Sequence, residues 1–209
     1  MRKQKRVRSE FIWLLVFLFW ENTLSSQSLK SEYYQCALEN YDMANYEKAI
    51  EYFNGVIEIN PEDSMAYFDR AMAKEMMRDY NGAISDYTKQ LKIDVNMVDC
   101  YFLRGIMLLK TDHNPQAIED FDRTLNIEAE NSDAYYYRSV AEFNLHEMNR
   151  AQLDCDRAIQ LNNSNNLYFL QKAKIYLSLN KRMIACNAFK KYIELGGKSS
   201  ETQSQLYCK

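Results

Sequence analysis

The sequence predicts an all-α protein built from tandem antiparallel helix hairpins. Three observations carry this prediction: an alanine that recurs every 34 residues, a fixed frame of aromatic and small residues around it, and a scarcity of helix breakers. The 209 residues include only five glycines and two prolines, which favours long helices joined by short turns. A period of roughly 20–50 residues marks a repeat architecture, in which each repeat is one supersecondary unit.

Four positions keep their spacing through five repeats, which we count as residues 30–63, 64–97, 98–131, 132–165 and 166–199. Position 4 is aromatic: Tyr33, Tyr67, Tyr101, Tyr135 and Phe169. Position 8 is small: Ala37, Ala71, Gly105, Ser139 and Ala173. Position 20 is the recurring alanine: Ala49, Ala83, Ala117, Ala151 and Ala185. Position 24 is bulky or apolar: Phe53, Tyr87, Phe121, Cys155 and Phe189. No insertion interrupts the five repeats, so composition bias does not explain them.

The second repeat shows why each unit is expected to be a helix hairpin. Tyr67, Ala71 and Lys74 are spaced i, i+4, i+7, so they share one face of a helix. The apolar residues between 83 and 91 have the same spacing and indicate a second helix. Asp79 lies between the two segments, where its side chain is expected to cap the second helix. Each repeat is therefore predicted to hold two helices of about 13 residues.

The turn of the third repeat offers Asn114 as the cap and Pro115 as the first helical residue, where its missing N–H costs nothing. Such short turns force the two helices to run antiparallel. In an antiparallel pair, residues at the same height have a constant sum of positions. We therefore expect position 8 to meet position 20, small against small, and position 4 to meet position 24, large against large.

The same arithmetic predicts a ladder of ion pairs in the three central repeats. Position 7 is arginine there: Arg70, Arg104 and Arg138. Position 23 is aspartate in the same repeats: Asp86, Asp120 and Asp154. The two positions are only about 3 Å out of step along the helices, within reach of an arginine side chain. The alternative role for these arginines is binding of an acidic ligand, but the carboxylates that would pair with them are already supplied within the chain.

The frame resembles that of the tetratricopeptide-repeat family, in which an alanine with an aromatic four residues on follows an aromatic and a Leu-Gly pair. In this chain the Leu-Gly pair is replaced, for example by Arg104-Gly105, and the closing proline survives only as Pro61. The resemblance covers residues 30 to about 198. It implies a right-handed superhelical solenoid of stacked hairpins, whose first helices line a concave groove that binds peptides.

By this resemblance, positions 5, 9 and 12 face the groove, and helical spacing by itself puts the three on one stripe. We call these residues the stripe. Its candidate partner-binding residues are Tyr34, Leu38, Tyr41, Phe68, Met72, Phe102, Ile106, Leu109, Tyr136, Val140 and Phe143. The remaining members are Glu75, Leu170, Lys174 and Leu177. Nearly all are apolar, which indicates a hydrophobic groove for an apolar segment or an amphipathic helix of another protein. Burial of the stripe as core, or its cover by the tail or by another copy, remains an equal alternative.

The two ends of the chain differ from the repeats. Residues 1–26 combine five basic residues with an uninterrupted apolar run from Phe11 to Trp20, the pattern of a signal peptide, or of an N-terminal membrane anchor if it is not cleaved. Cleavage is expected near Ser25 or Ser26. Residues 199–209 occupy the place of a further first helix and are expected to form a short, mostly polar cap that keeps Leu206 as its apolar contact.

No catalytic, metal-binding or cofactor motif is found, so we expect neither an enzyme nor a bound cofactor. His113 and His146 are both expected in turns. The five cysteines form no CxxC and no even framework, and we expect them to be small apolar fillers. The net charge of −3 and the lack of a basic patch beyond the N-terminus argue against nucleic-acid binding.

These observations predict a non-enzymatic protein-interaction scaffold, exported to the periplasm or cell envelope if the source is bacterial. Its partner is expected to be a peptide or helix of another protein. One alternative is a self-assembling structural component that dimerises through the apolar face. A lipid or small-molecule carrier using the same groove is the other.

Overall fold

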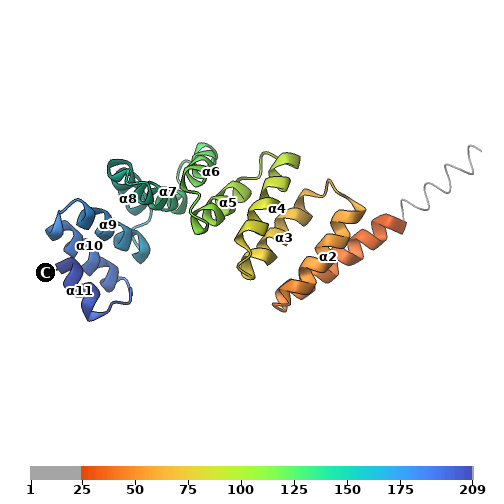
Figure 1. Cartoon of the computed structure of the whole chain (residues 1–209), viewed down its shortest axis with the longest axis horizontal. Coiled ribbons are helices and arrows are strands. Elements are labelled where there is room, and N and C mark those ends of the chain that lie inside the picture. Colours follow the sequence, from red (N-terminus) through yellow and green to blue (C-terminus); the bar gives the residue numbers. More distant parts are fainter. Residues whose placement is uncertain (1–24, 209) are drawn as a thin grey trace, which may run out of the picture. The chain divides into compact units, whose positions relative to one another are not determined.

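The computed structural model describes residues 25–208, and all the regular structure in this part of the chain is helical (Figure 1). Residues 25–42 are helical and precede α2. The helices that follow are α2 (Tyr46–Ile59), α3 (Ser64–Met76), α4 (Tyr80–Ile93), α5 (Val98–Lys110), α6 (Asn114–Ile127), α7 (Ser132–Asn144), α8 (Met148–Leu161), α9 (Asn166–Ser178), α10 (Arg182–Glu194) and α11 (Glu201–Cys208). The predicted all-α class is confirmed, and α3 to α10 are each 13 or 14 residues long.

The chain divides into two compact units that meet in sequence between Asp94 and Val95. The N-terminal unit holds the helical residues 25–42 and α2, α3 and α4. The C-terminal unit holds α5 to α11. Within them, the consecutive helices of a repeat, such as α3 with α4 and α7 with α8, pack extensively on each other. Each repeat is thus one hairpin, as the sequence predicts.

Each hairpin turns through a residue in the left-handed region at position 15. The φ angles lie between 56° and 62°, at Ala44, Arg78, Asp112, His146 and Asn180. The next backbone N–H bonds back across the turn to a carbonyl five residues earlier, as from Asp79 N to Lys74 O at 2.9 Å. This is the Schellman arrangement that ends a helix. The same geometry in five repeats explains why the helices reverse direction so uniformly.

Helix starts use side-chain caps at some turns and not at others. Asp79 caps α4 as predicted, since its carboxylate accepts a hydrogen bond from Gly82 N at 3.0 Å. The predicted cap at Asn114 is wrong, because Asn114 already belongs to α6 and His113 precedes it. The Asn114 amide oxygen instead accepts a hydrogen bond from Asn144 Nδ2 at 2.9 Å, so a tertiary contact replaces the cap.

The close approach of the two helices in a repeat occurs at the small residues, as expected. In the fourth repeat the Ser139 hydroxyl donates to the Ala151 carbonyl at 2.8 Å, joining position 8 to position 20. In the third repeat a Cβ on Gly105 would lie 2.7 Å from the ring of Phe121, so position 8 also faces position 24. The small residues therefore make room both for the opposite backbone and for the large side chain one turn along.

The side chain at position 24 packs against the ring at position 5. The expected pairing of positions 4 and 24 is therefore wrong. The ring centroids are 5.7 Å apart for Tyr34 with Phe53, and 5.7 Å apart for Phe68 with Tyr87. The position 4 ring instead lies under the arginine of its own repeat, as where Arg70 sits 5.4 Å from the ring centroid of Tyr67. Equal height along two helices thus did not decide which rings meet, because the direction of the side chains also matters.

The last helix, α11, packs on α10 (Figure 1). A disulfide between Cys186 and Cys208 joins the two helices. The expectation that all five cysteines are fillers is wrong for this pair. The apolar contact of the cap is Tyr207, which is 6 % exposed and stacks on Phe189 with ring centroids 4.5 Å apart. The expected Leu206 is instead 54 % exposed.

The leader predicted at residues 1–26 lies outside the described residues except for Ser25 and Ser26, which are helical and exposed. Among residues 25–208, no helix has the length and apolar character needed to span a bilayer.

Candidate functional site

In the N-terminal unit the stripe is partly core and partly open. Tyr34 and Tyr41 pack against the buried cluster that contains Ala49 and Phe53, and Phe68 is only 9 % exposed. Leu38 at position 9 is 37 % exposed, and Met72 at the same position of the next repeat is half-buried. Position 5 therefore anchors the core, while position 9 keeps apolar surface open.

In the C-terminal unit the stripe behaves in the same way. Rings at position 5 pack inward: the Phe102 ring lies 5.7 Å from the Tyr137 ring, and Tyr136 stacks on Tyr168 at 5.1 Å. Phe143 packs against the buried Cys155. The other apolar members of the stripe are half-buried: Ile106, Leu109, Val140, Leu170 and Leu177. Lys174 is exposed and Glu75, in the N-terminal unit, is half-buried.

The three predicted arginine–aspartate pairs come together with two hydrogen bonds each. Arginine Nε and Nη2 donate to the two carboxylate oxygens at distances of 2.6–2.8 Å. The pairs are Arg70–Asp86, Arg104–Asp120 and Arg138–Asp154. The aspartate side chains are between 4 and 11 % exposed, so these are largely buried bidentate ion pairs. Such pairs fix the geometry of two helices because a guanidinium fork meets a carboxylate in one orientation.

A further partner, which the sequence analysis missed, extends the ladder to the preceding repeat. Arg138 Nη1 donates to Asp122 at 2.6 Å, and Arg70 Nη1 donates to Asn54 at 2.6 Å. In the fifth repeat Lys172 replaces the arginine and binds Asp156 at 2.6 Å. These partners all occupy position 25, sixteen residues before the basic residue. The 34-residue frame could have revealed them, because the same polar position recurs in each repeat.

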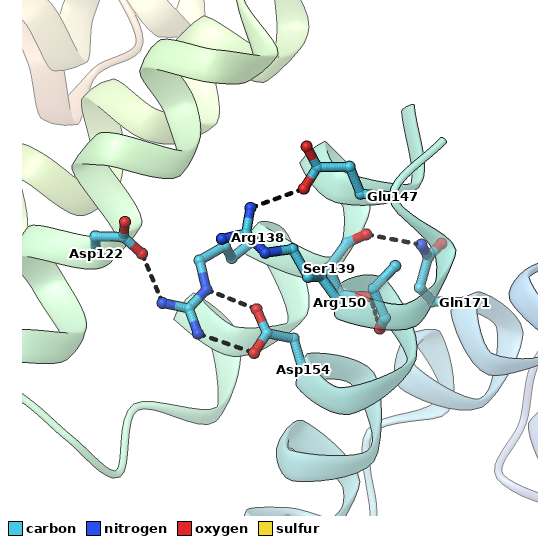
Figure 2. A network of polar contacts seen from close by, with 8 residues as sticks. Asp122, Arg138, Ser139, Glu147, Arg150, Asp154 and Gln171 are labelled. Carbon is cyan, nitrogen blue, oxygen red and sulfur yellow. Dashed lines mark hydrogen bonds and ion pairs between the residues drawn. The ribbon is translucent and has the colours of Figure 1, made fainter. Parts of the chain in front are cut away.

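Figure 2 shows the fullest version of this network, with Arg138 held between Asp122 and Asp154. Asp122 belongs to α6, Arg138 to α7 and Asp154 to α8, so one guanidinium joins three helices. The hydrogen bonds to Asp154 are the main cause of a raised pKa of Arg138. On the other side of α7, Gln171 of α9 donates to the Ser139 carbonyl at 3.4 Å.

Two cavities of the C-terminal unit are lined mainly by polar residues of this ladder and its neighbours rather than by the stripe. One of about 530 Å³ lies beside Arg104 and Asp120, and another of about 210 Å³ lies beside Arg138 and Asp154. A third, of about 470 Å³, lies at the turn around His146. Within residues 25–208 no group of three or more metal-ligating side chains comes together.

The Cys155 thiol and the Glu142 carboxyl of the C-terminal unit both have pKa values above their ordinary range. Burial raises the pKa of the Cys155 thiol to about 12, so this cysteine stays protonated and behaves as a filler. Burial, followed by the negative charge of Asp154, raises the pKa of Glu142 to about 8. Sequence reasoning did not single out Glu142, because nothing in its spacing shows that a carboxyl at position 11 is enclosed.

The described part of the chain thus defines a class, an all-helical protein of tandem hairpins. Residues 33–63 match the family model of the tetratricopeptide repeat. No curated protein matches the sequence. The fold of residues 25–208 is thus that of a tetratricopeptide-repeat solenoid, and one repeat matches the family model directly.

Solved structures share the fold at low sequence identity. MamA from Desulfovibrio magneticus RS-1 has a TM-score of 0.78 and 18 % identity, over 80 % of this chain and 95 % of that one. YrrB, described as a TPR protein with an unusual peptide-binding site, has a TM-score of 0.71 and 15 % identity, over 84 % and 88 % of the two chains. PilF of Pseudomonas aeruginosa has a TM-score of 0.69 and 16 % identity, over 84 % and 80 %.

Proposed function

We propose that this protein is a non-enzymatic interaction scaffold that binds an apolar peptide or helix of a partner along the stripe. The observation that carries the proposal is that the side chains at position 9 are apolar and partly exposed. Leu38, Met72, Ile106 and Val140 are apolar, and each remains at least partly exposed in the described structure. An apolar surface that the fold leaves uncovered marks an interaction site. The peptide-binding site named for YrrB supports the same use of this fold.

The expected affinity follows from the size of the anchors. Each large apolar side chain of the partner that becomes buried contributes about 1.5–3 kcal/mol. Three or four such anchors, after the cost of ordering the bound segment, give a dissociation constant of about micromolar. The partner is therefore expected to present apolar residues at helical or alternating spacing rather than a charged motif.

Replacing both Met72 and Ile106 by aspartate tests whether the stripe binds the partner. Burying a carboxylate against an apolar partner is strongly unfavourable, so the double variant should lose capture of the partner while keeping its helicity by circular dichroism. Met43→Asp with Met183→Asp is the matched control, because both methionines are exposed, at 70 and 78 %, and lie off the stripe. Equal capture by the stripe variant and the control would refute the assignment.

The oligomeric state separates this proposal from self-assembly. Analytical ultracentrifugation of the wild type and of the stripe variant should show a monomer in both cases. A tight wild-type dimer that the Met72→Asp, Ile106→Asp variant abolishes would assign the stripe to a homodimer instead. Native mass spectrometry of the purified protein adds a check on a carrier role, which predicts a co-purifying lipid or small molecule.

We also propose that the protein is exported, on the strength of the basic and apolar leader in residues 1–26. Trp13 and Trp20 are the two tryptophans of the sequence, and both precede the expected cleavage site. Cleaved protein should therefore show tyrosine but no tryptophan emission. Tryptophan emission from protein purified from the cell envelope would instead indicate an uncleaved anchor.

A further inference from the structure

The fourth repeat carries an acid where the second repeat carries a lysine. Position 11 is Lys74 in the second repeat and Glu142 in the fourth. The Lys74 ammonium lies 2.7 Å from Asp86, the position 23 aspartate of its own repeat. The corresponding aspartate of the fourth repeat is Asp154, so Glu142 brings a second carboxyl to the place where the second repeat holds a cation.

Glu142 is buried, and one of its oxygens is unsatisfied. Its exposed fraction is 4 %, and among residues 25–208 its Oε2 atom has no hydrogen-bond donor. A buried acceptor without a donor is unfavourable, and so are two neighbouring carboxylates. In the free protein a proton relieves both problems, which agrees with the raised pKa of Glu142, about 8.

The carboxyl of Glu142 borders a cavity of about 210 Å³ between α6, α7 and α8. A site needs only about 10–15 Å³ to hold a water, so this cavity has room for a larger group. Two of its lining residues are apolar, Ile118 of α6 and Leu153 of α8, and Leu153 is 69 % exposed. The cavity is therefore lined by charged residues and by two apolar side chains.

The charges around the cavity leave an excess of acid. Asp122 of α6 and Asp154 of α8 line the cavity together with Glu142 of α7. Both aspartates bind Arg138 (Figure 2). Arg150 of α8 also lines the cavity, but it is 67 % exposed and binds Glu147 at 2.8 Å. Arg138 and Arg150 are thus bound by three carboxylates, those of Asp122, Asp154 and Glu147. The Glu142 carboxyl is a fourth acid beside them.

We propose that this cavity binds a primary ammonium group, carried by a lysine side chain of a partner protein or by a free alkylamine. An ammonium offers three N–H donors in a compact charge, which suits the unsatisfied Glu142 oxygen and its neighbour Asp154. Its aliphatic stem would lie on Leu153 and Ile118. The bound ammonium replaces the Glu142 proton, which leaves to solvent, so binding releases one proton below the pKa of Glu142. Lys74 on Asp86 is the internal counterpart of the proposed complex.

The first test is the pH dependence of binding of n-butylammonium, measured by calorimetry. The dissociation constant should fall about tenfold per pH unit until it levels off near pH 8, the pKa of Glu142. Butyltrimethylammonium has the same charge without N–H donors and should bind at least about tenfold more weakly, because the loss of a donor leaves the acceptor unpaired. Equal binding of the two amines, an affinity that does not change with pH, or no binding of n-butylammonium would overturn the proposal.

Two substitutions locate the site. Glu142→Gln should weaken binding of n-butylammonium and abolish its pH dependence. Glu142→Lys should abolish binding by supplying the ammonium from within, as Lys74 does, and should raise the melting temperature. Circular dichroism confirms that both variants fold. Binding to Glu142→Lys with the wild-type affinity would place the amine elsewhere and refute the assignment.

Stability gives an independent readout without any ligand. The folded state holds the Glu142 proton more tightly than the unfolded chain does, so its contribution to stability is complete at low pH. It is lost progressively as the pH rises from the ordinary glutamate range through about 8. Glu142→Gln should flatten this decline in melting temperature, and an unchanged decline would show that Glu142 titrates normally.

A last comparison identifies the source of the ammonium. A short peptide with one lysine is compared with the same peptide carrying acetyl-lysine and with n-butylammonium. Tighter binding of the lysine peptide than of n-butylammonium assigns the cavity to a partner side chain, while equal or weaker binding assigns it to a free alkylamine. Equal binding of the acetylated and unmodified peptides would contradict an ammonium site.

Discussion

Single residues at position 15 set the direction of every hairpin. Five non-glycine residues there adopt φ between 56° and 62°. For a residue with a Cβ this conformation costs about 1 kcal/mol, whereas glycine adopts it freely. The helices nevertheless end here because their last carbonyls are satisfied by the N–H groups of the turn.

Replacing Ala44 by glycine is therefore expected to stabilise the protein by about 0.5–1 kcal/mol, because it removes the Cβ from a residue in the left-handed conformation. Chemical denaturation of Ala44→Gly measures the gain. Lys89→Gly, at an exposed position inside α4, is the control and should cost about 1 kcal/mol. A loss of stability in Ala44→Gly would show that the turn is not strained.

The aspartates of the ladder differ in which other charged side chains lie beside them. This difference decides how much stability is lost when the arginine partner is removed. Arg138→Ala leaves Asp154 beside Glu142, with no cation at position 11, and is expected to cost about 3–5 kcal/mol. Arg70→Ala leaves Asp86 with the ammonium of Lys74 at 2.7 Å and should cost less, about 1.5–3 kcal/mol. Equilibrium unfolding of the two variants provides the comparison. Equal losses would mean that position 11 does not modulate the ladder.

At the scale of elements, α11 depends on two contacts with α10. One is the stacking of Tyr207 on Phe189, and the other is the Cys186–Cys208 disulfide, which closes a loop with a sequence separation of 22. The helix has eight residues, too short to be stable in isolation. The cap therefore stays in place through its attachments rather than through its helix propensity.

Cys208→Ser is expected to lower stability by about 2–4 kcal/mol and to expose α11 to proteolysis and hydrogen exchange, because the unfolded chain gains freedom. Cys36→Ser is the control, since this half-buried thiol forms no disulfide in the described structure and its loss should have little effect. Protection of α11 that survives in Cys208→Ser would show that Tyr207 alone holds the cap.

At the scale of the whole molecule, stability is divided between two compact units. In a repeat protein each repeat contacts only its neighbours, so stability is a sum over repeats and interfaces. A fragment of residues 95–208 keeps its core around Phe121, Ile175 and Phe189 and its α11 cap. It is expected to fold alone with a cooperative thermal transition by circular dichroism. A non-cooperative or helix-poor fragment would show that the N-terminal unit is needed for folding.

Periodicity and side-chain type were sufficient to predict the helices, their pairing into hairpins and the arginine–aspartate partners. These features are local or repeat with the chain, so a spacing of 34 residues encodes them directly. The same frame also contained the second partners at position 25, which only the structure brought to notice.

Other features needed the tertiary structure because they depend on where side chains point and on what surrounds them. The choice of the position 5 ring over the position 4 ring, the contact of Tyr207 and the disulfide of Cys208 follow from side-chain direction in packed helices. The raised pKa of Glu142 follows from enclosure by three helices. The sequence by itself determined that this chain is a series of helix hairpins, because the 34-residue repeat can be read directly from the order of the residues. Only the tertiary structure decided that the Glu142 carboxyl is buried beside a second carboxyl, because burial arises when the helices assemble.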